Sequence, residues 1–317
     1  MEVKNWAELQ DRIITLYGQG KLREALEAAN SAAEIFPERA TRTSYWRACL
    51  YSLLGETRKA LAIFEEAVGH GIWWSETTLM NETDLAPIRD TPEFREIVLA
   101  CKHLGAAAQE GSRPQIMVLP PRKADGASPP PLLMALHSRG SDAQKFAPYW
   151  QPATETGIVV AIPQSSQMCA KDEFCWDDED RAATEVTWAY EKTRDSYRFD
   201  PSRVVIAGAS QGGRIAITAA LKGDPFQSRG FIAVVPAVRD IEGFVVLMDK
   251  AAPRGVRGYI ITGDRDQFYQ GACRLQDAME KNGLLCKLDV RPGMGHRFPP
   301  DFSDTLLRAL DFVLKGD

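Results

Sequence analysis

Long hydrophobic runs are absent from this 317-residue sequence. No stretch approaches the roughly 18 consecutive apolar residues that a membrane-spanning helix needs. The N-terminal segment MEVKNWAELQDR mixes charged and polar side chains where a secretory signal would place an apolar segment. We therefore expect no membrane span and a cytoplasmic location.

An excess of positive charge is also missing. Lysine and arginine total 38 against 43 aspartates and glutamates, which gives a formal net charge of −5. Because nucleic-acid-binding domains usually present a basic patch, we expect no nucleic-acid partner. The six cysteines are scattered and form no CxxC pair, and in a reducing compartment they are expected to be thiols.

Residues 1–104 place apolar and alanine residues at helical spacing. A set of small residues recurs after 35 positions, as Gly20, Ala25 and Ala32 and then as Gly55, Ala60 and Ala67. The spacing resembles the tetratricopeptide repeat, a helical hairpin of about 34 residues. The glycine would form the turn, and the alanines would let two helices approach closely. We predict a helical, tetratricopeptide-like domain here, with a small helical bundle as the alternative.

Trp73 and Trp74 stand side by side within this helical region. Such large aromatic side chains are costly to leave in water. We therefore predict that residues 1–104 pack on the rest of the chain or on a second subunit. The same region is the expected site of a protein partner or of self-association.

The pattern changes after His103. Residues 105–114, GAAAQEGSRP, are small, polar and end in proline, which predicts a linker. Over residues 115–317, short apolar segments alternate with longer amphipathic ones, and this alternation predicts a mostly parallel sheet flanked by helices. The expected strands lie within 131–137, 157–163, 203–210, 230–237, 258–264 and 287–293, and the expected helices at 182–197, 213–221, 272–282 and 302–314.

One of these strands runs into the sequence Gly-Ala-Ser-Gln-Gly, centred on Ser210. A G-x-S-x-G motif between a buried strand and a helix is typical of a nucleophile elbow, in which flanking glycines relieve crowding in a sharp turn. The alternative is a glycine- and serine-rich turn without a chemical role. We predict that Ser210 is a catalytic nucleophile.

A serine hydroxyl needs a base to become an effective nucleophile. Of the four histidines only His296 follows Ser210, and the order serine, acid, histidine is the one that this kind of elbow accompanies. The segment GYIITGDRDQF supplies the acid. Its G-x-x-D spacing favours Asp266, which would orient the imidazole, and Asp264 is the alternative.

Two backbone N–H groups are expected to form an oxyanion hole. One belongs to Gln211, which follows the nucleophile at a helix N-terminus. The other is assigned to Arg139 in MALHSRGSD, which looks like the His-Gly-x-Gly segment of esterases with Ser138 in place of its first glycine.

Together LHSRG, WDDED, GASQGG, GDRDQF and GMGHRF resemble the carboxylesterase/phospholipase branch of the α/β-hydrolase superfamily, over residues 115–317. The resemblance implies a compact enzyme with little or no lid that cleaves small acyl esters or thioesters through an acyl-enzyme on Ser210. No metal or organic cofactor is implied. Ser138, Trp176 and Phe268 are candidate substrate-pocket residues, although Trp176 could equally be a packing residue. Asp177 or Asp178 would cap the following helix.

Two other functions fit the same sequence. A serine peptidase of this fold would use the same catalytic residues, since a fold alone does not choose the bond that is cleaved. A scaffold protein would use the helical repeats to bind a partner and would carry a vestigial hydrolase domain. The sequence does not distinguish acyl chain length, the alcohol or the physiological substrate.

Overall fold

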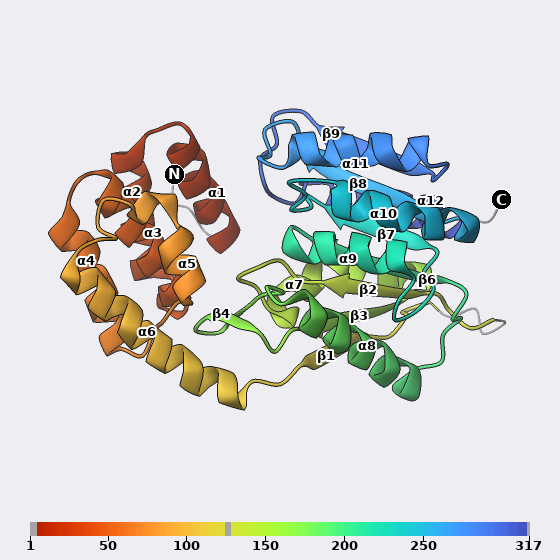
Figure 1. The fold of residues 1–317 in the computed structure, drawn as a ribbon, viewed down its shortest axis with the longest axis horizontal. Coiled ribbons are helices and arrows are strands. Elements are labelled where there is room, and N and C mark those ends of the chain that lie inside the picture. Colours follow the sequence, from red (N-terminus) through yellow and green to blue (C-terminus); the bar gives the residue numbers. More distant parts are fainter. Residues whose placement is uncertain (1–4, 124–127, 316–317) are drawn as a thin grey trace. The chain divides into compact units, whose positions relative to one another are not determined.

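A computed structural model describes residues 5–123 and 128–315. The chain divides into two compact units (Figure 1). The first, here called the helical unit, comprises Met1–Ser112 and the short segment Met168–Asp172. The second, here called the sheet unit, comprises Arg113–Gln167 and Glu173–Asp317.

Short helices joined by tight turns make up most of the helical unit. Its elements are α1 (Trp6–Gly18), α2 (Leu22–Ile35), η1 (Pro37–Arg39), α3 (Ala40–Leu53), α4 (Thr57–Gly69), α5 (Glu76–Asn81), η2 (Thr83–Leu85), α6 (Pro92–Gly111) and β4 (Met168–Ala170). From α1 to α4, each helix packs on the next one along the chain. Pro92 is the first residue of α6, and the Thr91 side chain caps this helix by accepting the Phe94 N–H.

The residues that recur in the sequence occupy equivalent places. Gly20 and Gly55 both have positive φ, at +72° and +76°, in the turns before α2 and α4. Only glycine adopts this backbone without strain. Ala25 and Ala60 are completely buried, one turn into the helix that follows each glycine. The predicted turns and close helix contacts are therefore present, while assignment to the tetratricopeptide class stays a prediction.

Trp73 and Trp74 are buried within the helical unit itself. The Trp74 ring packs edge-on against Phe64 at 5.2 Å, and Trp74 forms a β-bridge with Ala170. Backbone hydrogen bonds on either side join Ser75 N–H to the Cys169 carbonyl and Lys171 N–H to the Trp73 carbonyl. A five-residue segment from the later sequence thus covers the tryptophans.

The segment 105–114 differs from the predicted linker. Helix α6 continues through it to Gly111, because its three consecutive alanines are the strongest helix formers. Gly105 is explained by packing: a Cβ there would lie 3.0 Å from the Trp73 ring. The glycine that suggested a chain break is instead the place where an indole lies against the helix.

A seven-stranded sheet forms the centre of the sheet unit. Its order is β1-β3-β2-β6-β7-β8-β9, with β1 antiparallel to β3 and the other pairs parallel. The elements are β1 (Gln115–Leu119), β2 (Leu132–Leu136), α7 (Ala143–Trp150), η3 (Gln151–Thr156), β3 (Val159–Gln164), β5 (Glu173–Phe174), α8 (Glu179–Ser196), β6 (Val204–Ala209), α9 (Gln211–Lys222), β7 (Gly230–Val234), α10 (Glu242–Ala251), η4 (Ala252–Arg254), β8 (Arg257–Gly263), α11 (Tyr269–Lys281), β9 (Cys286–Arg291) and α12 (Phe302–Leu314).

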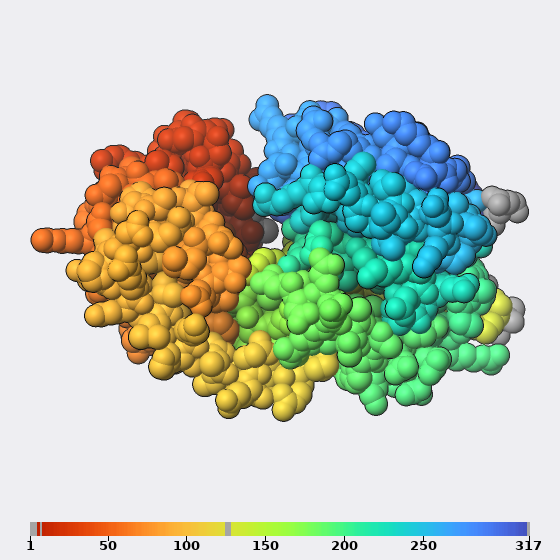
Figure 2. Space-filling model, viewed as in Figure 1, coloured from red at the N-terminus to blue at the C-terminus, as the bar shows by residue number. Residues whose placement is uncertain are grey.

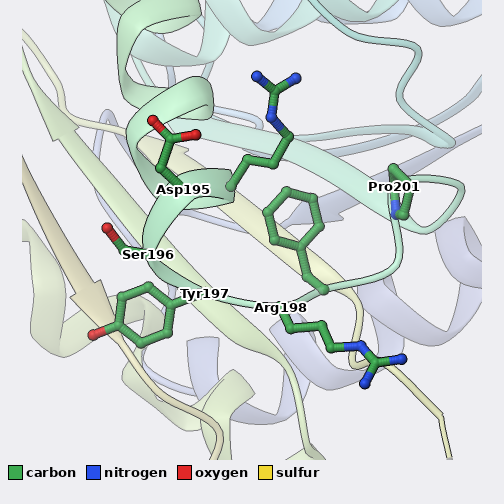
Figure 3. Close-up of a pocket in the computed structure, with 7 residues that line it drawn as sticks. Asp195, Ser196, Tyr197, Arg198 and Pro201 are labelled. Atoms are coloured by element: carbon green, nitrogen blue, oxygen red, sulfur yellow. The ribbon is translucent and has the colours of Figure 1, made fainter.

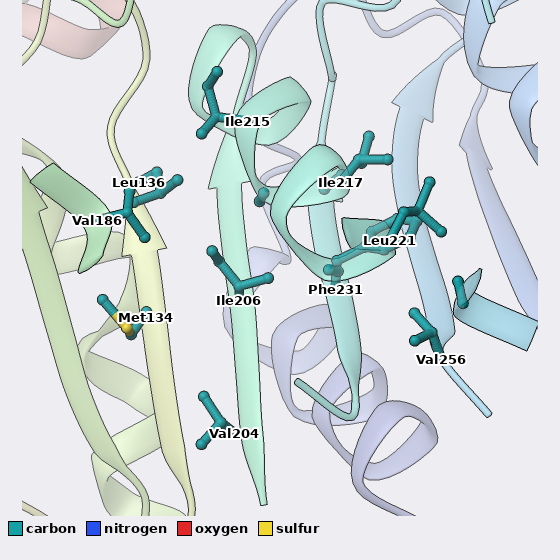
Figure 4. Close-up of a cluster of buried hydrophobic side chains, with 14 of the residues drawn as sticks. Met134, Leu136, Val186, Val204, Ile206, Ile215, Ile217, Leu221, Phe231 and Val256 are labelled. Atoms are coloured by element: carbon teal, nitrogen blue, oxygen red, sulfur yellow. The ribbon is translucent and has the colours of Figure 1, made fainter. Parts of the chain in front are cut away.

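Helices cover both faces of this sheet. Alternate strand residues point to opposite sides, so that in β6 Val204 and Ile206 pack with α8, α9, α10 and α11 (Figure 4). Val205, Ala207 and Ala209 pack instead with α7 and α12. Residues of α8, α9, α10 and α11, coloured green to blue, form much of the face of the sheet unit seen in Figure 2. The predicted helix-flanked, mostly parallel sheet is confirmed.

The six expected strands all form, but β1, α7 and α10 are among the elements of the sheet unit that were not expected. The antiparallel edge strand β1 directly follows the segment interpreted as a linker. Helix α7 contains Pro148, a residue that argues against a helix interior. Helix α10 contains Gly243, Val245 and Val246, a glycine followed by β-branched residues that favour a strand.

Within residues 5–123 and 128–315, none of the helices combines the length and the hydropathy that crossing a bilayer requires.

Candidate active site

Three parallel strands end at the same edge of the sheet, and the predicted catalytic residues follow them. Ser210 follows β6, Asp266 follows β8 and His296 lies in the loop after β9. Because neighbouring parallel strands place their carboxyl ends together, residues distant in the sequence meet at this edge. The strand pairing shows this alignment of carboxyl ends: Ala209 of β6 pairs with Val234 of β7, and Gly263 of β8 pairs with Arg291 of β9.

Ser210 occupies a strained turn between β6 and α9. Its backbone has φ 53° and ψ −116°, a region that residues with a Cβ rarely enter. Backbone hydrogen bonds hold it there: Ser210 N–H donates to the Val234 carbonyl at 2.9 Å, and the Ser210 carbonyl accepts from Ala237 N–H at 3.0 Å and from Arg214 N–H at 3.1 Å. The turn leaves Ser210 partly exposed at the end of a buried strand.

Glycines around Ser210 let α9 approach the sheet closely. A Cβ on Gly212 would lie 2.3 Å from the Leu136 carbonyl oxygen and 2.4 Å from that of His137. A Cβ on Gly208 would lie 2.5 Å from the Gly212 backbone. Positions 208 and 212 therefore require glycine, because neither has room for a Cβ.

We expect Gly212→Ala to lower the free energy of unfolding by about 1–3 kcal/mol, the usual cost of overpacking, and to reduce activity. Denaturant unfolding and an ester assay measure the two effects. Gly243→Ala in α10 is the matched control, because no atom lies within 4 Å of its added Cβ. If the two variants were equally stable, this account of the glycine motif would be wrong.

Ser210, His296 and Asp266 form a continuous hydrogen-bonded chain. His296 Nε2 lies 2.8 Å from Ser210 Oγ, and His296 Nδ1 lies 2.9 Å from Asp266 Oδ2. An ionised carboxylate only accepts, so Nδ1 carries the proton and Nε2 is left to accept from the serine hydroxyl. The Asp266 side chain is fully buried, and its Oδ1 accepts the Phe268 N–H at 2.8 Å.

Asp264 has different partners. It is exposed, and its Oδ1 accepts the Gly293 N–H at 2.7 Å. Arg265 N–H also donates to the Met294 carbonyl, and a Cβ on Gly263 would lie 1.9 Å from that carbonyl oxygen. Asp264 therefore helps to join the loop after β8 to the loop that carries His296.

Of the two residues expected to form the oxyanion hole, Gln211 directly follows Ser210 and Arg139 lies in another loop. Gln211 is the first residue of α9, where helical N–H groups lack intrahelical partners. Arg139 lies in the loop after β2, whose last residue, Leu136, pairs with Gly208 of β6. This register places the loop beside the Ser210 turn.

His137 anchors the start of that loop from inside the protein. It is fully buried, its Nδ1 donates to the Ser138 carbonyl at 2.9 Å and its Nε2 accepts the Ser165 N–H at 3.2 Å. Burial lowers the pKa of His137 to about 4. Sequence reasoning missed this role, although a histidine directly after an apolar strand was a visible signal.

The pH dependence of stability should report His137. Between pH 6.5 and about 4 the folded protein binds fewer protons here than the unfolded chain, so stability falls as the pH falls. We expect this group to cost about 2 kcal/mol of unfolding free energy between pH 7.5 and pH 5. Denaturant unfolding of the natural protein and of His137→Gln, across that range, isolates the contribution. Equal pH slopes in the two proteins would contradict the assignment.

The three candidate pocket residues have different environments. Phe268 is partly buried, and the centroid of its ring lies 5.4 Å from that of the His296 ring. The Arg239 guanidinium lies over the Phe268 ring, 5.3 Å from the ring centroid. Ser138 is partly exposed. Trp176 is fully buried; its indole N–H donates to the His137 carbonyl, and its ring lies 4.8 Å from that imidazole. This burial fits the packing alternative for Trp176.

A separate hollow of about 380 Å³ lies at the end of α8 (Figure 3). The hollow is lined by residues that come before β6, whereas Ser210 comes directly after that strand. The six residues of β6 span about 20 Å, which separates the two places. The hollow is therefore at the opposite edge of the sheet from the site. Its lining residues are Arg194, Asp195, Ser196, Tyr197, Arg198, Phe199 and Pro201.

Comparison with known proteins agrees with this architecture. Residues 5–109 match the family model described as A/B hydrolase-like, N-terminal domain. A crystal structure of an uncharacterized protein from Bacillus cereus ATCC 10987 aligns with 98% of this chain and 99% of its own, at 24% identity and a TM-score of 0.56. Esterase PE8 aligns with 64% of this chain and 100% of its own, at 19% identity and a TM-score of 0.51.

The protein has an α/β-hydrolase fold. The Bacillus cereus alignment extends over nearly the whole chain, including the helical region before the sheet unit. The fluorophosphonate-binding serine hydrolase FphF of Staphylococcus aureus is a further similar structure, aligned over 63% of this chain and 92% of its own at 17% identity and a TM-score of 0.49. No curated protein matches the sequence.

Proposed function

We propose that this protein is a serine hydrolase that cleaves small carboxylic esters or thioesters through an acyl-enzyme on Ser210. The observation that carries the proposal is the hydrogen-bonded chain from Ser210 Oγ through His296 to the buried Asp266 carboxylate, at 2.8 and 2.9 Å. A nucleophile, its base and a group that orients the base form the arrangement required for covalent acyl transfer.

In the first half of the proposed reaction, Ser210 Oγ attacks the carbonyl carbon while its proton moves to His296 Nε2. The carbonyl oxygen becomes an oxyanion, which the N–H groups of Gln211 and Arg139 would stabilise. The Asp266 carboxylate stabilises the imidazolium formed on His296. Collapse of the tetrahedral intermediate breaks the bond to the alcohol or thiol, which takes the proton from Nε2.

In the second half, water attacks the acyl-enzyme. His296 Nε2 accepts a proton from the water as its oxygen bonds to the acyl carbon. The second tetrahedral intermediate then releases the carboxylic acid, and the proton returns to Ser210 Oγ. The first and the last of these proton transfers run between Ser210 Oγ and His296 Nε2, which lie 2.8 Å apart.

Fluorophosphonate labelling with a panel of substrates tests the proposal. The probe should modify the natural protein on Ser210 and leave Ser210→Ala unlabelled. Among p-nitrophenyl esters of graded chain length, thioesters and aminoacyl anilides, the esters or thioesters should give the highest kcat/KM. Preferential cleavage of the anilides would make the protein a peptidase of the same fold. Failure both to label and to turn over any of these substrates would favour a scaffold role.

A further inference from the structure

Asp177 lies between the two residues proposed to bind the oxyanion. Its Oδ1 accepts a hydrogen bond of 2.8 Å from the Gln211 side-chain amide. Its Oδ2 accepts one of 2.9 Å from the Arg139 guanidinium. A single carboxylate therefore joins the loop after β2 to the first residue of α9.

The Gln211 side chain is held at both ends of its amide. While its Nε2 donates to Asp177, its Oε1 accepts the Trp176 backbone N–H at 2.8 Å. Rotation of the amide would break both hydrogen bonds. Because the side chain and the backbone N–H belong to one residue, these contacts also restrain the start of α9 next to Ser210.

Backbone hydrogen bonds to Phe174 hold the residues that follow Arg139 in its loop. Gly140 N–H donates to the Phe174 carbonyl at 2.8 Å, and Phe174 N–H donates to the Ser141 carbonyl at 3.0 Å. Gly140 itself has φ +75°, a conformation in which glycine alone is unstrained. The ion pair with Asp177 adds a restraint on Arg139 itself.

This ion pair contributes little to overall stability. The Arg139 and Asp177 side chains are 31% and 40% exposed, and water and salt screen exposed pairs strongly. The neighbouring Asp178, not Asp177, caps α8, by accepting the Arg181 N–H at 3.0 Å. Asp177 is thus left with two side-chain contacts, one to each flank of the proposed oxyanion hole.

We propose that Asp177 is a positioning residue that sets the separation of the Gln211 and Arg139 N–H groups. The inference rests on the proposed function. Donors to an oxyanion act mainly when negative charge develops in the transition state. Displacing them should therefore lower kcat and change KM little.

Asp177→Asn tests the proposal, with Asp178→Asn as the matched control. Asparagine keeps the shape but offers one oxygen and one NH₂, so it can accept from Arg139 or from Gln211 and not from both. The control removes the same charge at the adjacent position, where asparagine caps a helix as well as aspartate does. Both variants are assayed on the best p-nitrophenyl ester for kcat, KM and thermal midpoint.

We expect Asp177→Asn to lower kcat about 10–100-fold, less than the loss of a whole oxyanion donor, with KM within about threefold. Its thermal midpoint and all parameters of Asp178→Asn should stay close to those of the natural protein. A trifluoromethyl ketone supplies a second readout, because addition of Ser210 Oγ to its carbonyl gives an alkoxide in the same place. Its inhibition constant should weaken in Asp177→Asn by the same factor as kcat/KM.

An unchanged kcat in Asp177→Asn would overturn the inference. So would equal losses in the two variants, or a loss of kcat with unchanged binding of the ketone. A natural protein that is neither labelled by the fluorophosphonate nor active on esters would instead overturn the proposed function. The two failures are therefore distinguishable.

Discussion

Ser210→Ala is expected to lower kcat by about 10⁴-fold or more, because the members of a catalytic triad act as a unit. The substitution removes Ser210 Oγ, which lies 2.8 Å from His296 Nε2. His296→Ala should cause a loss of similar size. Residual turnover would reflect binding and the oxyanion donors alone. Steady-state kinetics on the best p-nitrophenyl ester, corrected for spontaneous hydrolysis, measures the effect.

Folding of Ser210→Ala should be unaffected. Alanine retains a Cβ, so the backbone strain at φ 53° is the same in both proteins. Serine here makes no side-chain cap to α9 that alanine would lose. Circular dichroism and the thermal midpoint serve as controls. If Ser210→Ala kept even a tenth of the rate of the natural protein on this ester, Ser210 would not be the nucleophile.

Asp266→Asn should reduce kcat/KM by about 10⁴-fold, the scale seen when the orienting acid of a triad is replaced by its amide. The amide can present an NH₂ to His296 Nδ1, which favours the tautomer with a proton on Nε2. That nitrogen would then be unable to accept from Ser210. Asp264→Asn is the matched control, two residues earlier in the same loop. It should lose less than about tenfold, since Asp264 contacts Gly293 and not the imidazole.

The order of these two losses decides the acid. A larger loss in Asp264→Asn would transfer the role to that residue, and small equal losses would remove both from the mechanism. Stability must be measured in parallel, because Asp264 joins the loops after β8 and β9. A variant that loses activity only in proportion to its unfolded fraction would indicate a structural role.

Much of the sheet unit could be predicted from sequence because its signals are local. Strand β6, Val204–Ala209, is buried on both faces, so its sequence is an uninterrupted apolar run. Gly208 and Gly212 on either side of Ser210 indicate the sharp turn. Helix α12 also has its expected bounds, Phe302–Leu314. His296 and Asp266 were selected by chain order and by G-x-x-D spacing.

The remainder depends on tertiary contacts that no local pattern encodes. Gly105 suggested a chain break because the Trp73 ring that requires it is 32 positions earlier in the sequence. Asp177 could not be told from Asp178 as the cap of the following helix, because its partners, Arg139 and Gln211, lie in two other parts of the sequence. Val246 is 71% exposed in α10, where a β-branched residue at a solvent position gives no helical periodicity to detect.

The segment Met168–Asp172 bears on how this architecture can be inherited or recombined. It is encoded between β3 and α8, yet it folds with the helical unit, where it pairs with Trp73 and Trp74. Replacing everything before Arg113 would leave this segment without its partners, and moving the N-terminal region to another protein would leave two indoles uncovered. The helical unit therefore cannot be transferred as a single continuous segment. A working chimera must exchange residues 1–112 and 168–172 together.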